Sequence, residues 1–276
     1  MRNFLIAAYI LCCLSGPAQS FTRIGLDADI TFYVDLTLPS SGDCLTPETA
    51  CSTDQDAIDL VATRYDLGGK TATILRVSAQ TGTVGVEFWP FTGGGKSRVI
   101  FDINGGAIIV SSGSAVVNRG GPGTASLYLK GGTLRTTDPQ GYCVLWQISG
   151  KVFLESSMIY NGCGQAAISS AATGSVVQID TTLQISGGAT RVLLAGAGGM
   201  IYGTDAPTTV IFTNNPTIAY YAQMMEIGGI QTLNWNYYGA ANVSYRCVAT
   251  KGGHFLATGG VPPGSNVYND SSSTCQ

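Results

Sequence analysis

Short β-type runs that each follow a glycine recur along this chain, and they constrain its fold more than any other feature. Six such glycines stand 26, 18, 24, 25 and 30 residues apart: Gly106, Gly132, Gly150, Gly174, Gly199 and Gly229. A period of roughly 25 residues is typical of repeat architectures. We therefore expect a coil in which each turn adds one strand to each of two or three parallel sheets, with residues of successive turns stacked about 4.8 Å apart.

The composition favours stacked strands over disorder. Charged residues make up 11% of the chain and hydrophobic residues 45%, with 37 glycines. Disorder needs low hydrophobicity and high net charge, which this chain lacks. The expected fold class is all-β, a right-handed parallel β-helix. An antiparallel sandwich built from the same short strands is the alternative, and strand composition alone does not exclude it.

One helix is expected, over residues 53–66, just before the first turn of the coil. Ser52 or Thr53 can cap its N-terminus, and Gly68-Gly69 ends it. Its apolar residues recur at helical spacing and form one face: Ala57, Ile58, Val61, Ala62 and Tyr65. An amphipathic helix in this place can cover the exposed N-terminal end of the core.

The first 20 residues read as a secretory signal peptide. Arg2 precedes an apolar run of residues 4–14, and Ala18 and Ser20 are small residues at −3 and −1 of a cleavage site before Phe21. A short membrane anchor is the alternative. No later segment reaches about 18 continuous apolar residues, so no membrane insertion of the mature chain is expected. We expect one secreted or periplasmic domain over residues 21–276.

Six cysteines remain after cleavage, an even number that predicts three disulfides in an exported chain. Six cysteines allow 15 connectivities. We favour pairing between sequence neighbours: Cys44–Cys51, Cys143–Cys163 and Cys247–Cys275. The alternative is a zinc site, but the chain has no CxxC motif and a single histidine, His254.

The charge balance argues against two classes of partner. Removing residues 1–20 leaves 13 Lys and Arg against 17 Asp and Glu, with no run of cations. Nucleic acids and anionic membrane surfaces need clustered cations, so neither is expected as a partner. No cluster of aspartates suggests a calcium site, and no cofactor is expected.

The N-terminal third resembles a known family. Residues 30–35 (ITFYVD), 42–50 (GDCLTPETA), 56–59 (DAID) and 65–69 (YDLGG) look like the start of phage- and prophage-type right-handed parallel β-helix proteins of the pectate-lyase-like superfamily. The resemblance implies that the whole mature chain is one β-helix, with a polysaccharide-related role and a bacterial host. Homotrimers are common among such relatives, although no trimerisation segment is evident here. The signal peptide and the cysteines argue against a virion component.

One column of charged residues is the candidate catalytic site. Aligning the strands at 98–103, 126–130, 151–155, 175–180 and 209–213 stacks Asp102, Lys130, Glu155 and Asp180 at spacings of 28, 25 and 25. Carboxylates on successive turns would lie about 5 Å apart, the separation used by retaining glycosidases. Like charges that close raise one pKa and produce an acid. The alternative is an outward-facing ladder in which Lys130 pairs with Asp102 and Glu155 in water.

Aromatic side chains are candidates for stacking on sugar faces. Trp235, Tyr237 and Tyr221 are favoured, with Trp89, Trp146, Tyr220 and Tyr238 as further candidates. The pairs 220–221 and 237–238 each place one tyrosine outward if they lie on strands. Packing in the core is the alternative for all of them. A structural role is expected for His254.

Two functional hypotheses follow. The first is a non-catalytic secreted β-helix that binds a polysaccharide or surface glycan, or serves as a cell-surface component. The second is a polysaccharide lyase or glycoside hydrolase acting on an extracellular polysaccharide. The chain lacks the Asn-Thr-Asp and Asp-Asp motifs of β-helix hydrolases that resemble polygalacturonases, which favours the first.

Overall fold

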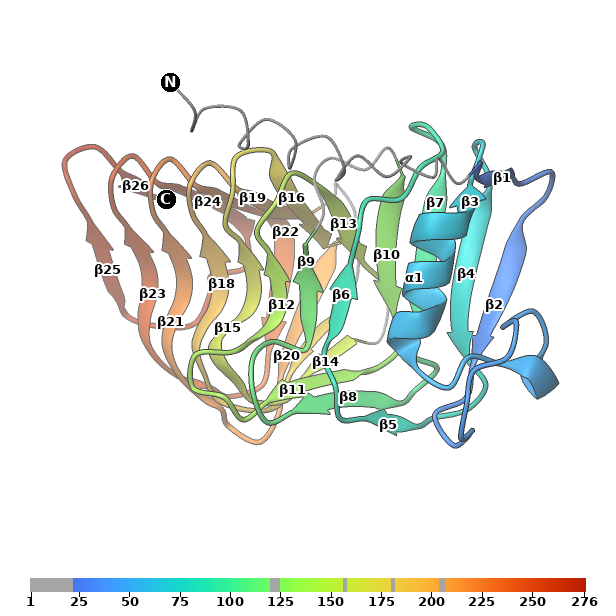
Figure 1. Ribbon diagram of the computed structural model, residues 1–276. Helices are drawn as coiled ribbons and strands as arrows, with labels where there is room; N and C mark the ends of the chain where they lie inside the picture. Colours follow the sequence, from blue (N-terminus) through green and yellow to red (C-terminus); the bar gives the residue numbers. More distant parts are fainter. Residues whose placement is uncertain (1–21, 120–124, 156–157, 180–181, 204–206) are drawn as a thin grey trace, which may run out of the picture.

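The protein is an all-β parallel β-helix of about 7 turns with one α-helix near its N-terminus (Figure 1). The computed structural model describes residues 22–119, 125–155, 158–179, 182–203 and 207–276. The predicted signal peptide and Asp180 lie outside these residues. Every strand pairing is parallel, as the coil predicted and as a sandwich would not allow.

The strands form three faces. The first face contains β2 (Ile30–Val34), β4 (Thr71–Arg76), β7 (Arg98–Asp102), β10 (Ser126–Lys130), β13 (Gly150–Leu154), β16 (Ser175–Ile179), β19 (Met200–Gly203), β22 (Gly229–Tyr238), β24 (His254–Gly259) and β26 (Thr274–Cys275). The second contains β5 (Thr81–Gly82), β8 (Ala107–Val110), β11 (Thr133–Thr136), β14 (Met158–Tyr160), β17 (Leu183–Ile185) and β20 (Thr208–Phe212), and ends on β22. The third contains β6 (Val86–Phe88), β9 (Val116–Asn118), β12 (Tyr142–Trp146), β15 (Cys163–Ser170), β18 (Ala189–Ala195), β21 (Thr217–Met224), β23 (Asn242–Ala249) and β25 (Asn266–Asn269).

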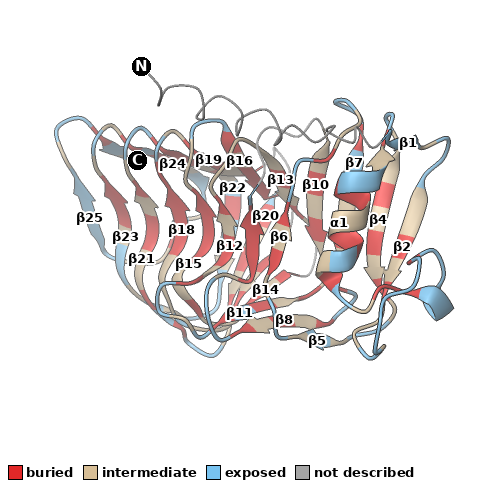
Figure 2. Ribbon diagram, in the orientation of Figure 1, coloured by how far each residue is buried: buried red, intermediate tan, exposed pale blue. Residues whose placement is uncertain are grey.

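The core lies inside the coil, where alternate residues of each strand stack on their counterparts one turn away. On the first face, Val99, Leu127 and Val152 occupy one such inward column and are buried. Figure 2 shows the resulting alternation of buried and more exposed residues along the strands. Because apolar residues repeat every second position within a strand, each turn adds one layer to a continuous apolar core.

The glycines that revealed the repeat belong to two faces. Gly106 and Gly132 directly precede second-face strands, whereas Gly150, Gly174 and Gly199 stand at or before first-face strands. The short spacing of 18 between Gly132 and Gly150 is therefore a step from the second face to the first. Within the first face the spacing is steadier, because Lys151 pairs with Val176 and Val176 with Met200, which are 25 and 24 residues later.

Helix α1 (Asp54–Arg64) covers the N-terminal end of the third face, beside β6 (Figure 1). Thr53 caps it by accepting a hydrogen bond from the backbone N–H of Asp56. The predicted helix at 53–66 ran two residues too far at its C-terminal end, because Tyr65–Asp66 form β3, which pairs with β1 (Ile24–Gly25). The Gln55 amide bonds both the N–H and the C=O of Glu87, so a side chain occupies the place of a neighbouring strand.

A buried ion pair joins α1 to the first turns. Both oxygens of Asp54 accept from Arg76, at 2.9 Å from Nε and 2.5 Å from Nη2. Nη1 of Arg76 also donates to the backbone carbonyls of Gln80 and Ala107. The Arg76 side chain is fully buried, so these acceptors replace its hydration.

The three predicted disulfides are confirmed. Cys44–Cys51 closes a loop whose backbone covers the free edge of β2: Tyr33 donates to the Cys44 carbonyl, and Cys51 donates to the Tyr33 carbonyl. A short 3-10 helix, η1 (Pro47–Thr49), lies within this loop. Cys143–Cys163 joins successive turns on the third face, and Cys247–Cys275 ties β26 to β23. The bridges thus fix the entry, the middle and the end of the coil.

Candidate functional site

A ladder of aromatic side chains runs along the outside of the first face. The register stacks Tyr128, Phe153, Gln178 and Tyr202 on four successive turns. The rings of Tyr128 and Phe153 lie parallel, 4.4 Å apart between centroids and inclined by 4°. We call Tyr128, Phe153 and Tyr202 the aromatic ladder. Its rings project outward because they alternate with inward residues such as Leu127 and Val152.

Cations line the same surface. The Nζ atom of Lys151 lies 4.3 Å from the Phe153 ring centroid and 5.4 Å from that of Tyr202. The guanidinium carbon of Arg98 lies 5.4 Å from the Tyr128 centroid. Within the part of the chain that the structure describes, neither cation pairs with a carboxylate. Their charge is therefore available to an anionic ligand.

A groove of about 470 Å³ opens between these side chains. It is lined by Gly95, Lys96, Ser97, Arg98, Ser126, Tyr128, Lys151 and Phe153. It thus combines two aromatic rings with three cationic side chains and the half-buried hydroxyl of Ser126. The strand alignment behind the charged column already brings Tyr128 beside Phe153, two residues before Lys130 and Glu155. Aromatic residues at matching positions of two aligned strands are thus a sequence signal for this site.

The charged column has the predicted register where the structure describes it. Lys130 pairs with Asp102 in the strand ladder, and its Nζ lies 3.1 Å from an Asp102 carboxylate oxygen. Glu155 follows β13, and its backbone N–H bonds the Leu129 carbonyl, which places it one turn beyond Lys130. Asp102 thus forms a partly exposed ion pair with Lys130. This is the pairing that the outward-facing ladder predicted for these two residues.

In this register, Asp102 and Glu155 are too far apart to form a close carboxylate pair. Asp102 and Glu155 lie two turns apart with Lys130 between them, or roughly 10 Å at 4.8 Å per turn. A retaining-type pair at about 5 Å would need Glu155 and Asp180, and Asp180 lies outside the described residues. The alignment was wrong for 209–213, because that segment belongs to β20 on the second face, where β17 is its neighbour.

The prediction that Trp235 and Tyr221 stack on sugar faces is wrong. Trp235 and Tyr221 are fully buried in the core, so their faces cannot contact a ligand. Tyr237 is partly buried and packs edge-on against Tyr221, with 3.2 Å between the two hydroxyl oxygens. Burial raises the pKa of both hydroxyls above the usual value for tyrosine. These residues stabilise the last turns instead of presenting a platform.

The remaining aromatic candidates differ in their exposure to solvent. Tyr238 is 58% exposed and Trp89 is 42% exposed, while Trp146 is buried and donates from Nε1 to the Gly150 carbonyl. Tyr220 projects outward beside its buried neighbour. His254 is exposed, and its Nδ1 shares a 2.7 Å hydrogen bond with the Thr274 hydroxyl on the next strand, which is the structural role expected for it.

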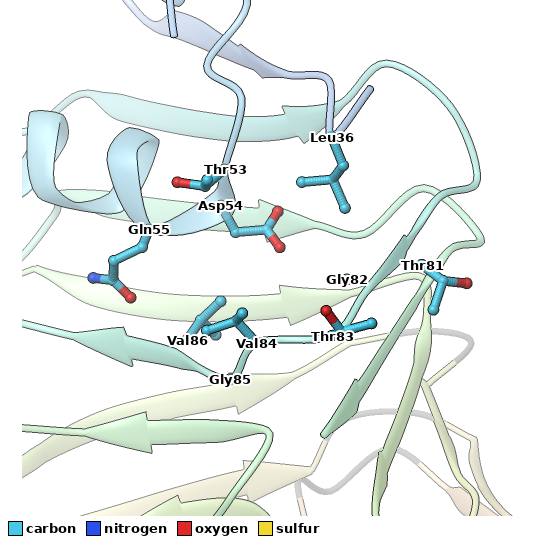
Figure 3. Close-up of a pocket in the computed structure, with 10 residues that line it drawn as sticks. All are labelled: Leu36, Thr53, Asp54, Gln55, Thr81, Gly82, Thr83, Val84, Gly85 and Val86. Atoms are coloured by element: carbon cyan, nitrogen blue, oxygen red, sulfur yellow. The ribbon is translucent and has the colours of Figure 1, made fainter. Parts of the chain in front are cut away.

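A second cavity, of about 310 Å³, lies where α1 meets the second face. Figure 3 shows its lining, including Leu36, Asp54 and Val86, with the Asp54 carboxylate directed away from Gln55. Asp54 is its one charged lining residue, and Arg76 binds both of its oxygens. The cavity therefore offers an apolar seam with no free charge, and it is a weaker candidate for ligand binding than the ladder groove.

The described residues contain no group of three or more His, Cys, Asp or Glu side chains arranged to hold a metal ion. They also contain no helix with the length and apolarity needed to cross a membrane. No protein-family model, no curated protein and no solved structure matches the chain. The aromatic ladder and its cations are thus the features on which a function can be argued.

Proposed function

We propose that this protein is an exported, non-catalytic β-helix that binds an acidic polysaccharide on its first face. The observation that carries the proposal is the stacked Tyr128–Phe153 pair flanked by Arg98 and Lys151, two cations without carboxylate partners in the described chain. The predicted signal peptide and the three disulfides support export to an oxidising compartment. A bacterial host is part of the proposal only through the family resemblance of the N-terminal segment.

The chemistry of the groove suits a chain of uronic acids. Aromatic faces bind the C–H face of a pyranose, because burying both apolar surfaces releases water. Lys96, Arg98 and Lys151 supply charge-assisted hydrogen bonds to carboxylates. Each turn advances about 4.8 Å, which is close to the length of one sugar residue, so a polysaccharide aligned with the coil axis can place two successive sugars on Tyr128 and Phe153.

Calorimetric titration of the disulfide-bonded mature chain with trigalacturonate and with neutral maltotriose tests this proposal. We expect binding of the acidic trisaccharide, weakened about tenfold by Tyr128→Ala and by Lys151→Gln. Tyr238→Ala removes a more exposed tyrosine, on β22, and should leave affinity unchanged. Equal affinity of the wild type for both trisaccharides, or no effect of Tyr128→Ala and Lys151→Gln, would contradict the proposal.

A second function is supported by the carboxylate of Glu155. It stands on the same face as the aromatic ladder and, among the described residues, has no ion-pair partner. As an acid or base beside a bound polysaccharide, it would make the protein a lyase or glycoside hydrolase. Mass spectrometry of acidic and neutral polysaccharides after long incubation distinguishes the two functions. New oligosaccharides that disappear in Glu155→Gln would replace the binding function by the enzymatic one.

A further inference from the structure

A shallow groove of about 490 Å³ crosses the beginning of the third face, on a different side of the coil from the aromatic ladder. Its lining includes Thr136, Pro139, Gly162, Gly164, Ala189 and Thr190. Glycine, alanine and threonine make up most of this floor. Gly164 cannot be replaced without movement, because a Cβ there would lie 2.1 Å from the Asp138 carbonyl oxygen. The groove forms here because small side chains let the backbones of successive turns pack directly against each other.

One end of the groove carries a positioned arginine. Arg191 directly follows the lining residue Thr190, and its Nη1 donates to the Gln165 side-chain oxygen at 2.5 Å. Its Nε donates to the Gln223 side-chain oxygen, and its guanidinium lies 5.8 Å from the Tyr220 ring centroid. Two neutral amides and one ring thus hold the guanidinium, and among the described residues Nη2 has no acceptor. The orientation of the cation is fixed while its charge is left uncompensated.

A second arginine stands at the other border. Arg135 precedes the lining residue Thr136 and is exposed, and its Nε lies 4.0 Å from the place that a Cβ would take at Gly162. Asp138, next to the lining residue Pro139, forms no ion pair with Arg135 or Arg191. Its oxygens accept instead from the backbone N–H groups of Gly113 and Gln140, which lower its pKa.

A pair of tyrosines extends the surface from Arg191 toward the end of the coil. Tyr220 and Tyr245 are partners in the strand ladder, with ring centroids 5.5 Å apart and planes inclined by 31°. Arg191 lies one turn before Tyr220 and is its partner in the strand ladder. An uncompensated guanidinium followed on successive turns by two rings presents a carboxylate-binding group and a stacking surface in one line.

We propose that this groove is a second saccharide-binding site, selective for a sugar that carries a carboxylate. Arg191 and Arg135, at opposite borders of the groove, each bind a different carboxylate of the ligand. The flat floor admits the ring between them, and Tyr220 with Tyr245 stacks on the next residue of the ligand. The site stands on residues other than those of the aromatic ladder and does not depend on the function proposed there. With both sites, one molecule holds two polysaccharide segments and cross-links them, which raises avidity without new contacts.

The test compares stoichiometry and affinity for trigalacturonate in five proteins: the wild type, Arg135→Gln with Arg191→Gln, Tyr220→Ala, Tyr128→Ala, and the control Arg119→Gln. Arg119 is an exposed arginine paired with Glu87, and it does not line the groove. We expect two sites in the wild type and in Arg119→Gln, with one lost in the double arginine variant through an at least tenfold weakening. Tyr220→Ala should weaken the same site.

The outcomes separate this site from the ladder. If only Tyr128→Ala removes binding, the groove is not a site and the inference fails. If only the arginine and Tyr220 variants remove binding, the inference stands and the proposed function of the ladder fails. Acetate and maltotriose serve as competitors. Displacement of trigalacturonate by acetate at equal concentration would reduce the groove to a simple anion site, and displacement by maltotriose would remove its selectivity. Either result overturns the proposal.

Discussion

Replacing Asp54 by alanine tests whether the buried ion pair holds the N-terminal cap on the coil. The change removes both carboxylate oxygens that Arg76 binds at 2.9 and 2.5 Å. Arg76 keeps only the carbonyls of Gln80 and Ala107, and its side chain stays fully buried beneath α1. A buried guanidinium is then left with a charge that no anion offsets.

The expected cost follows from that burial. Removing one partner of a buried ion pair typically costs about 3–5 kcal/mol, because the remaining charge stays desolvated. For a chain of this size, that loss corresponds to a fall of roughly 6–20 °C in Tm. Replacing both partners by apolar residues, Asp54→Leu with Arg76→Met, should recover most of the loss, since no buried charge then remains.

Urea unfolding followed by tryptophan fluorescence measures the change in the free energy of unfolding. Hydrogen exchange should show α1 and β2 losing protection first, because in a solenoid each turn is stabilised mainly by its neighbours. Asp56→Ala, a change in an exposed carboxylate of the same helical turn, is the matched control and should cost under about 1 kcal/mol. A loss for Asp54→Ala no larger than that of the control would refute the reasoning.

Three further predictions concern the middle and end of the coil. Replacing Cys143 and Cys163 together by alanine should lower the free energy of unfolding by about 3 kcal/mol, because the bridge closes a loop of 20 residues; an unchanged urea midpoint under non-reducing conditions would argue against it. The pKa of Asp270 is lowered by hydrogen bonds, chiefly from the Ser273 hydroxyl and the Lys251 backbone N–H. Its stabilisation should therefore be complete above about pH 4, the usual aspartate pKa, and be lost as pH falls further; Asp270→Asn should flatten the fall of the urea midpoint in that range. Gly164→Ala should destabilise the third face by about 1–3 kcal/mol, since its Cβ would meet the Asp138 carbonyl; calorimetric melting measures this loss.

Some strands could be predicted and others could not, for a reason visible in their composition. The run at 107–110 was predicted with its observed bounds, since it is continuously β-branched or apolar and follows a glycine. By contrast, β15 contains Gly, Gln, Ala and Ser, which have weak strand propensity, and it forms a strand because β12 and β18 pair with it on either side. Pairing with a neighbouring turn is invisible to any local pattern.

For the candidate site, too, the sequence predicted some features and not others. Adjacent tyrosines at 220–221 predicted that one ring points out and one in, and alternation alone suffices for that. It cannot say which one, and the structure buries Tyr221. Trp235 was favoured as a ligand platform by its chemical type, yet the last turns of the core enclose it. Side-chain chemistry is the same in both places, and only the path of the surrounding backbone decides exposure.

The sequence alone predicted the parallel coil, its capping helix and the pairing of its three disulfides, and the structure confirmed them. Each of these follows from short-range signals: a glycine-marked period, a capped amphipathic segment, and an even set of cysteines whose neighbours lie within one turn or a short loop of each other. Only the tertiary structure decided that Arg98 and Lys151 beside the Tyr128–Phe153 stack pair with no carboxylate of the described residues, and that Arg191 and Arg135 border one groove. Those juxtapositions depend on the register between turns, and a shift of one residue would send each of these side chains to the opposite side of its sheet.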